Sequence, residues 1–83
     1  MTEHIPDLIY TALEHEAKAN INKAEATIEI YFTSPVGIGE HPQHLDEIGK
    51  LLDVIATNED RLEVLTKYFS DYNESRGNQW NLL

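Results

Sequence analysis

Residues 34–42 of this chain read Ser34-Pro35-Val36-Gly37-Ile38-Gly39-Glu40-His41-Pro42, and they divide the sequence into two halves. The residue before a proline avoids helical geometry, so a helix that arrives from the N-terminal side is expected to end at Pro35. Gly37 and Gly39 permit the backbone conformations of a turn, and Pro42 suits the first turn of a following helix. The stretch therefore predicts a connection between two helices, from about residue 33 to about residue 41.

The half before this connection carries an apolar stripe at helical spacing. Its members are Ile9, Leu13, Ala17, Ile21, Ala24, Ile28 and Tyr31. Steps of three and four residues place them on one face of an α-helix. Pro6 and Asp7 suit the start of that helix, because proline is tolerated in the first turn and a carboxylate complements the positive end of the helix dipole. We expect a helix from about residue 6 to about residue 32.

One segment of this predicted helix has a composition typical of a strand. Residues 27–33 are rich in β-branched and aromatic side chains, which favour extended structure. An isolated strand would leave its backbone groups unpaired, and no second strand is visible in the sequence. Helix is the favoured interpretation, and strand stays open as the alternative.

The half after the connection carries a second apolar stripe. It consists of Leu45, Ile48, Leu51 or Leu52, Ile55, Leu62, Leu65, Phe69 and Tyr72. The spacing is heptad-like, with Asn58 and Glu59 interrupting it. Residues 57–60 resemble a capping box and indicate a local kink or a second helix start. We expect a helix from about residue 42 to about residue 72.

A polar tail follows over residues 73–83, and it contains Trp80, Leu82 and Leu83 near its end. Chain ends are commonly frayed, which is the first interpretation of this segment. The alternative is a tail that docks an aromatic anchor onto its own helices or those of a neighbour.

Length, charge and cysteine content limit the class of protein. The 83 residues form one domain at most, over residues 1–83, and the absence of cysteine excludes disulfides and thiolate metal sites. A formal charge of −9 repels nucleic acid phosphates and anionic lipids, so no direct nucleic acid binding is expected. No apolar run approaches the roughly 20 residues that cross a bilayer, and the N-terminus does not resemble a signal peptide. We expect no membrane association and a cytoplasmic location, in the host cytoplasm if the protein is viral.

The predicted fold is all-α, a long antiparallel helical hairpin. Each helix has a wide apolar face, and one partner helix covers only part of it, so a second copy is expected to complete a four-helix bundle. A homodimer is favoured over a monomer covered by its own tail and over an obligate complex with another protein. The expected interface residues are Ile9, Leu13, Ala17, Ile21, Ala24, Ile28, Ile48, Leu52, Ile55, Leu62 and Phe69.

The densest group of potential metal ligands lies at the connection. Glu40, His41 and His44 are candidates for a zinc shell, because imidazoles and carboxylates are zinc ligands. Histidines at a loop–helix junction are more often surface residues or caps. We therefore expect no metal, no cofactor and no catalytic residue.

Paired carboxylates leave one enzymatic alternative open. All-α nucleotide pyrophosphohydrolases of the MazG-like kind hold magnesium with Glu-x-x-Glu and Glu-x-x-Asp pairs on neighbouring helices. Here Glu25 and Glu29 lie one turn apart in the first predicted helix, and Asp60 and Glu63 in the second. The first spacing is wrong for that pattern and the second pair is reversed, which favours charged flanks of amphipathic helices.

One stretch of the sequence resembles a known group of proteins. Residues 35–42, followed by an acidic amphipathic helix that runs to Tyr68 and Phe69, resemble small uncharacterised proteins of marine T4-like tailed phages over about residues 28–72. The resemblance implies a phage source and no mechanism. The sequence as a whole favours a non-enzymatic oligomeric interaction protein. An acidic inhibitor that imitates DNA and binds a basic protein is a further alternative.

Overall fold

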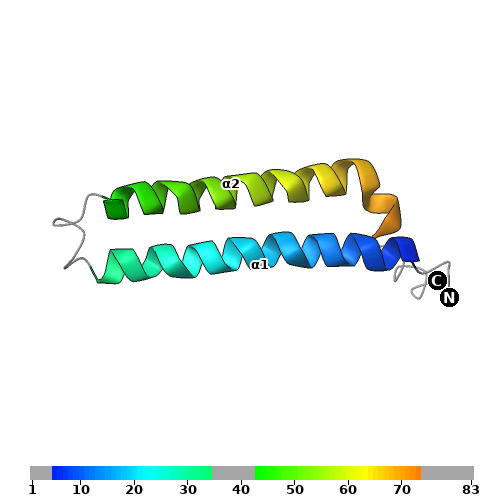
Figure 1. Ribbon diagram of the computed structural model, residues 1–83. Helices are drawn as coiled ribbons and strands as arrows, with labels where there is room; N and C mark the ends of the chain where they lie inside the picture. Colours follow the sequence, from blue (N-terminus) through cyan, green and yellow to red (C-terminus); the bar gives the residue numbers. More distant parts are fainter. Residues whose placement is uncertain (1–4, 35–42, 74–83) are drawn as a thin grey trace.

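The computed structural model describes residues 5–34 and 43–73, and nearly all of them are helical. Helix α1 spans Ile5–Thr33, helix α2 spans Gln43–Phe69, and a short 3-10 helix, η3, spans Ser70–Tyr72. The two long helices lie side by side and run in opposite directions, as Figure 1 shows. The all-α fold and the helical hairpin are thus confirmed.

The hairpin is a rod. It measures 58 × 21 × 20 Å and has a radius of gyration of 17.7 Å. A compact globular domain of this length has a radius of gyration of about 12 Å. A rod of two helices offers little interior, and only four apolar side chains of the described ranges are buried: Tyr10, Ala17, Ala24 and Ile28.

Residues 27–33 are helical, so the strand alternative is wrong. The hydroxyl groups of Thr27 and Thr33 donate to the carbonyl oxygens of Lys23 and Glu29, one turn earlier, at 2.9 and 2.8 Å. Such bonds to the preceding turn satisfy a threonine within a helix. Ile28 is buried against α2, and this packing outweighs the β-propensity of the segment.

Three contacts define how the helices are paired. The Tyr10 hydroxyl lies 3.5 Å from Thr66 Oγ1, and the Asn20 amide donates to Asn58 Oδ1 at 3.2 Å. Near the connection, the Tyr31 and His44 rings lie 5.2 Å apart. From the first pair to the third, the residue number rises in α1 and falls in α2, as antiparallel packing requires.

The face of α1 that meets α2 differs from the predicted stripe in its first half. Ile9 and Leu13 are 56% and 48% exposed, whereas Tyr10 is buried and Glu14 is half-buried. A step of four residues advances about 40° beyond a full turn, so successive steps of four move around the helix. Alternating steps of three and four, from Tyr10 through Glu14 to Ala17, keep to one side.

Asn58 belongs to the contact face of α2, and the prediction that it interrupts the stripe is wrong. The residue is only 5% exposed. Its amide nitrogen donates to the Val54 carbonyl at 2.7 Å, while its oxygen accepts the bond from Asn20. No second helix start occurs at residues 57–60, since α2 passes through them without interruption.

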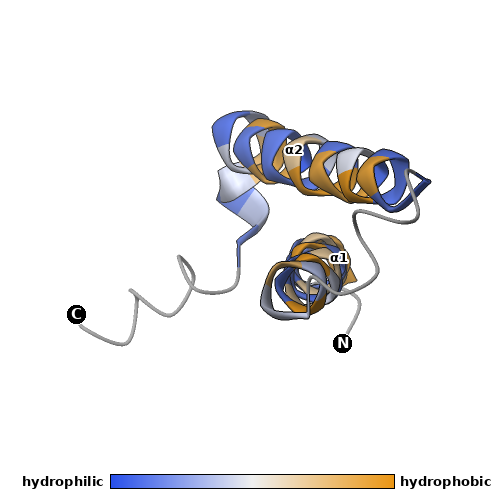
Figure 2. Cartoon of the chain, turned by 90° about the vertical axis from the view of Figure 1, so that its left-hand side faces the viewer, coloured by the Kyte–Doolittle hydropathy of each residue, from blue (hydrophilic) through white to orange (hydrophobic). Residues whose placement is uncertain are grey.

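Helix α2 is also shorter than predicted. Its last residue is Phe69, where φ of −130° and ψ of 14° depart from α-helical geometry. Helix η3 then turns towards the start of α1, with which it is in contact (Figure 1). Figure 2 shows that hydrophobic residues (orange) recur along both long helices.

We expect the two asparagines to be energetically coupled. Asn58→Ala should lower the free energy of unfolding by about 1–3 kcal/mol, because it leaves the half-buried Asn20 amide without its acceptor. In a double-mutant cycle, Asn20→Ala and Asn58→Ala should show a coupling of about 0.5–1.5 kcal/mol. The measurement is urea denaturation followed by circular dichroism at one fixed protein concentration.

The matched control for this cycle is Asn22→Ala, at an exposed position of the same helix. It should raise stability slightly, by about 0.5 kcal/mol, since alanine is the better helix former. Additive effects of the Asn20 and Asn58 substitutions would contradict the assigned role of the pair.

Candidate functional site: an apolar groove at the open end of the hairpin

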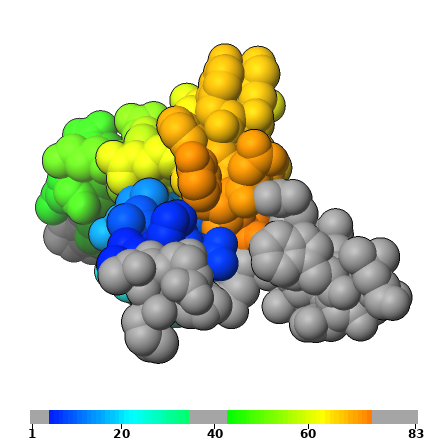
Figure 3. Space-filling model, turned by 90° about the vertical axis from the view of Figure 1, so that its right-hand side faces the viewer, coloured from blue at the N-terminus to red at the C-terminus, as the bar shows by residue number. Residues whose placement is uncertain are grey.

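Large apolar side chains are exposed over much of the rod. Thirteen of them are exposed within the described ranges. Eight of the thirteen lie in residues 5–13 and 64–72, at the end of the hairpin opposite the connection: Ile5, Leu8, Ile9, Leu13, Val64, Tyr68, Phe69 and Tyr72. Figure 3 looks onto this end, where the start of α1 (blue) lies beside the end of α2 and η3 (yellow to orange). The exposed apolar surface is therefore concentrated at the open end.

Two adjoining hollows mark this surface. The first has a volume of about 300 Å³ and is lined by Leu13, Glu16, Ala17, Asp60, Arg61, Leu62, Val64, Leu65 and Phe69. The second has a volume of about 460 Å³ and is lined by Pro6, Ile9, Tyr10, Leu13, Leu65, Phe69 and Tyr72. Leu13, Leu65 and Phe69 line both, so we treat the two as one feature, the open-end groove.

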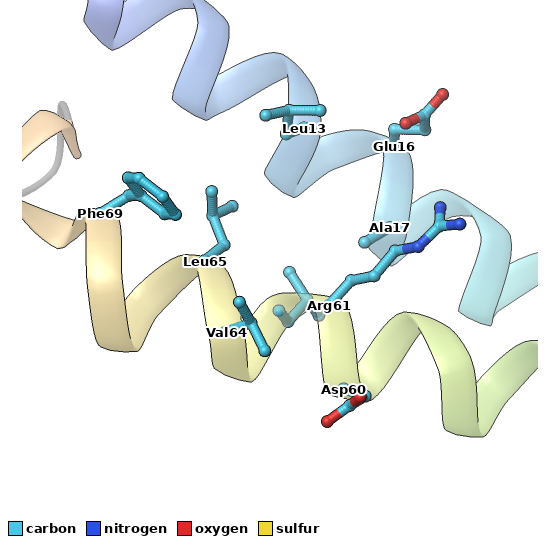
Figure 4. Close-up of a pocket in the computed structure, with 9 residues that line it drawn as sticks. Leu13, Glu16, Ala17, Asp60, Arg61, Val64, Leu65 and Phe69 are labelled. Carbon is cyan, nitrogen blue, oxygen red and sulfur yellow. The ribbon is translucent and has the colours of Figure 1, made fainter.

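Side chains from both helices form the groove. In Figure 4, Leu65 and Phe69 project from α2 towards the side of α1 that carries Leu13. Arg61, Glu16 and Asp60 lie at the inner end of the groove, further along the hairpin (Figure 4). Of the lining residues that the structure describes, those of the outer hollow are uncharged, and the charged ones lie at the inner end.

The described lining of the outer hollow is largely apolar. Among the described residues that line it, only Tyr10 and Tyr72 carry a polar side-chain atom, and the Tyr10 hydroxyl lies within hydrogen-bonding distance of Thr66. A concave apolar surface with few polar groups suits the burial of an apolar side chain.

The eleven predicted interface residues fall into three groups. Ala17, Ala24 and Ile28 are buried between α1 and α2. Ile21, Ile48, Ile55 and Leu62 are half-buried along the same contact. Ile9, Leu13, Leu52 and Phe69 remain exposed. Seven of the eleven thus hold the hairpin together, and four are available to a partner.

The sequence interpretation missed Tyr10, Asn20 and Asn58. Each of them joins α1 to α2 by a side-chain contact. The signal was present for Asn58, because Ile55, Asn58, Leu62 and Leu65 keep steps of three and four residues. Asn58 is polar but continues this spacing, so its polarity does not mark a break in the contact face.

The structure leaves most of the candidate zinc site undescribed. Glu40 and His41 lie outside the described residues. His44 is half-buried and packs its ring against Tyr31 inside the hairpin. Within residues 5–34 and 43–73, no three His, Asp or Glu side chains are grouped so as to hold a metal ion.

The carboxylate pairs considered for magnesium lie at different levels of the rod. Asp60 and Glu16 line the same hollow, whereas Glu25 lies nine residues further along α1 than Glu16. Nine residues of α-helix span about 14 Å, too far for two carboxylates to share one ion. The arrangement gives the enzymatic alternative no support.

No protein-family model, curated protein or solved structure matches this chain. In the part of the chain that the structure describes, neither helix combines the length and the apolar character that a bilayer crossing requires. The function must therefore be argued from the geometry.

We expect the carboxylate pairs not to act together on magnesium. A calorimetric titration of the native chain with Mg²⁺ should match that of the variant Glu25→Gln/Asp60→Asn, because the two carboxylates are too far apart to chelate one ion. Saturable binding in the native chain that the double variant loses would restore the enzymatic alternative.

Proposed function

We propose that this chain is a non-enzymatic interaction protein that assembles with a second copy of itself into a four-helix bundle. The observation that carries the proposal is the number of large apolar side chains that the hairpin leaves exposed. Thirteen are exposed in the described ranges, against four apolar side chains that are buried. Eight of the thirteen gather at the open end, and monomeric soluble proteins rarely expose large apolar patches.

The small core supports the same proposal. Two of the four buried apolar residues are alanines, which contribute little apolar area. A chain of this length without disulfides commonly needs oligomerisation to offset the conformational entropy lost on folding. Association with a second hairpin would add the missing buried area.

A second copy fits the distribution of the exposed residues. Beyond the open end, Ile30, Phe32, Leu45, Leu52 and Val54 are exposed along the half of the rod nearer the connection. These side chains extend the exposed apolar surface along much of the rod, and a second rod of the same length is long enough to cover those on one side of it. Two-fold symmetry then makes the same residues serve on both copies.

Charge opposes this association and gives it a signature. Each copy carries a formal charge of −9, so two copies repel each other. Salt screens that repulsion and leaves apolar burial in place. Association should therefore strengthen as the salt concentration rises, whereas a complex with a basic protein would weaken.

We expect light scattering after size exclusion to give a mass of about 19 kDa, twice the 9.5 kDa of the chain. Leu45→Ser/Leu52→Ser, which replaces two exposed side chains of α2, should shift the mass towards the monomer. The control Ala56→Ser/Thr57→Ser changes two exposed polar or small positions of the same helix and should leave the mass unchanged. Circular dichroism checks that each variant is helical.

The salt dependence is the second measurement in this test. Sedimentation equilibrium in low and high sodium chloride should show a dissociation constant that falls as salt is added. A single 9.5 kDa species at every concentration and every salt level would remove the basis of the proposal.

A further inference from the structure

The open-end groove lies where the described chain ends. Tyr72 lines the groove, and Asn73 is the last described residue. Asn73 has extended backbone angles, φ −73° and ψ 123°, so the chain leaves η3 in an extended conformation. Ten residues follow, and their large apolar side chains are Trp80, Leu82 and Leu83. We propose that residues 80–83 of the same chain occupy the open-end groove, with the Trp80 indole in the outer hollow.

The length of the segment permits this contact. Six residues separate Asn73 from Trp80, and the seven Cα–Cα steps between these two residues span up to about 24 Å when extended. Along α1, the outer hollow runs from Pro6 to Leu13, a distance of about 10 Å. Trp80 therefore reaches every part of the hollow with slack in the intervening residues.

The chemistry of the two partners matches. The outer hollow has a volume of about 460 Å³ and an almost wholly apolar lining. An indole is the largest apolar side chain that a protein can offer, and its N–H needs one polar neighbour when buried. Of the described residues that line the hollow, Tyr10 and Tyr72 carry hydroxyl groups, which are potential acceptors for the indole N–H.

Tethering favours this occupant over a separate molecule. A short linker holds the segment near the groove at an effective concentration of about millimolar, so even a weak contact is populated. The contact also leaves Leu45 and Leu52, on the other half of the rod, free for a second copy. The inference therefore does not depend on the proposed dimer.

The test uses the single tryptophan of the chain, whose fluorescence reports residue 80 alone. In the full-length protein, the emission maximum should lie at shorter wavelength than in the urea-unfolded chain, and acrylamide quenching should be several-fold weaker. Both follow from an indole held in an apolar hollow.

Substitutions locate the binding surface. Leu13→Gln and Ile9→Gln, made separately in the groove, should each move the emission to longer wavelength and increase quenching. The matched control is Leu52→Gln, since Leu52 is 54% exposed, close to the 48% of Leu13 and the 56% of Ile9, but lies outside the groove. Its emission should equal that of the native chain. Circular dichroism confirms that each variant remains helical.

Dilution separates docking within a chain from docking on a second copy. Emission that stays unchanged while light scattering records dissociation supports the proposal. Emission that follows the mass on dilution would overturn it and assign Trp80 to the partner copy. Emission like that of the unfolded chain, or emission that Leu13→Gln and Ile9→Gln both leave unchanged, would overturn it as well. The mass itself tests the dimer separately, so either idea can fail alone.

Discussion

An α-helix that packs against a single neighbour buries one face and leaves the rest of its circumference to the solvent. In this chain, that constraint limits the contact between α1 and α2 to a line of residues at alternating steps of three and four. Tyr10, Ala17, Ala24 and Ile28 are buried along that line, and residues immediately beside it, such as Leu13, are already half exposed. The apolar content of the sequence exceeds what so narrow a contact can cover. The surplus forms the open-end groove and the exposed residues nearer the connection.

Within this narrow contact, small and polar side chains set the geometry. Ala17 and Ala24 let the helix backbones approach each other. Asn58 lies on the contact face, and its side-chain oxygen accepts a hydrogen bond from the Asn20 amide when the helices are correctly aligned. A buried asparagine specifies register in coiled coils at a cost in stability. A shift of one helix by a turn would bury the Asn58 amide against apolar neighbours.

Much of the fold could be predicted from the sequence, because two long apolar stripes on either side of a Pro- and Gly-rich stretch admit few arrangements. The helix boundaries agree with the structure within about three residues, as expected for helix ends placed from sequence alone. The contact face was harder to predict. Ile9 and Leu13 are more apolar than Tyr10 and Glu14, and hydrophobicity alone selects the wrong pair. The structure instead keeps Glu14 half-buried, with its carboxylate 3.5 Å from the Lys18 ammonium group.

The candidate site was less predictable than the fold for the same reason. The groove is formed by apolar residues that are not buried between the two helices. A rotation of a few tens of degrees about each helix axis decides which residues remain unburied. The expected interface list contained Ile9, Leu13 and Phe69, which line the groove, but it did not separate them from Ala17 and Ala24, which hold the hairpin together. Only the rotational setting of α1 against α2 makes that distinction.

The opposite directions of α1 and α2 also have an electrical consequence. The N-terminus of α1 and the C-terminus of α2 lie at the same end of the rod (Figure 1), so a positive and a negative helix pole sit beside each other. The two macrodipoles offset, and neither end of the rod acts as a pole. The electrostatic field at a distance from the molecule is therefore set by its ionised side chains, whose net charge is −9, and the helix dipoles give a charged partner no preferred end of the rod.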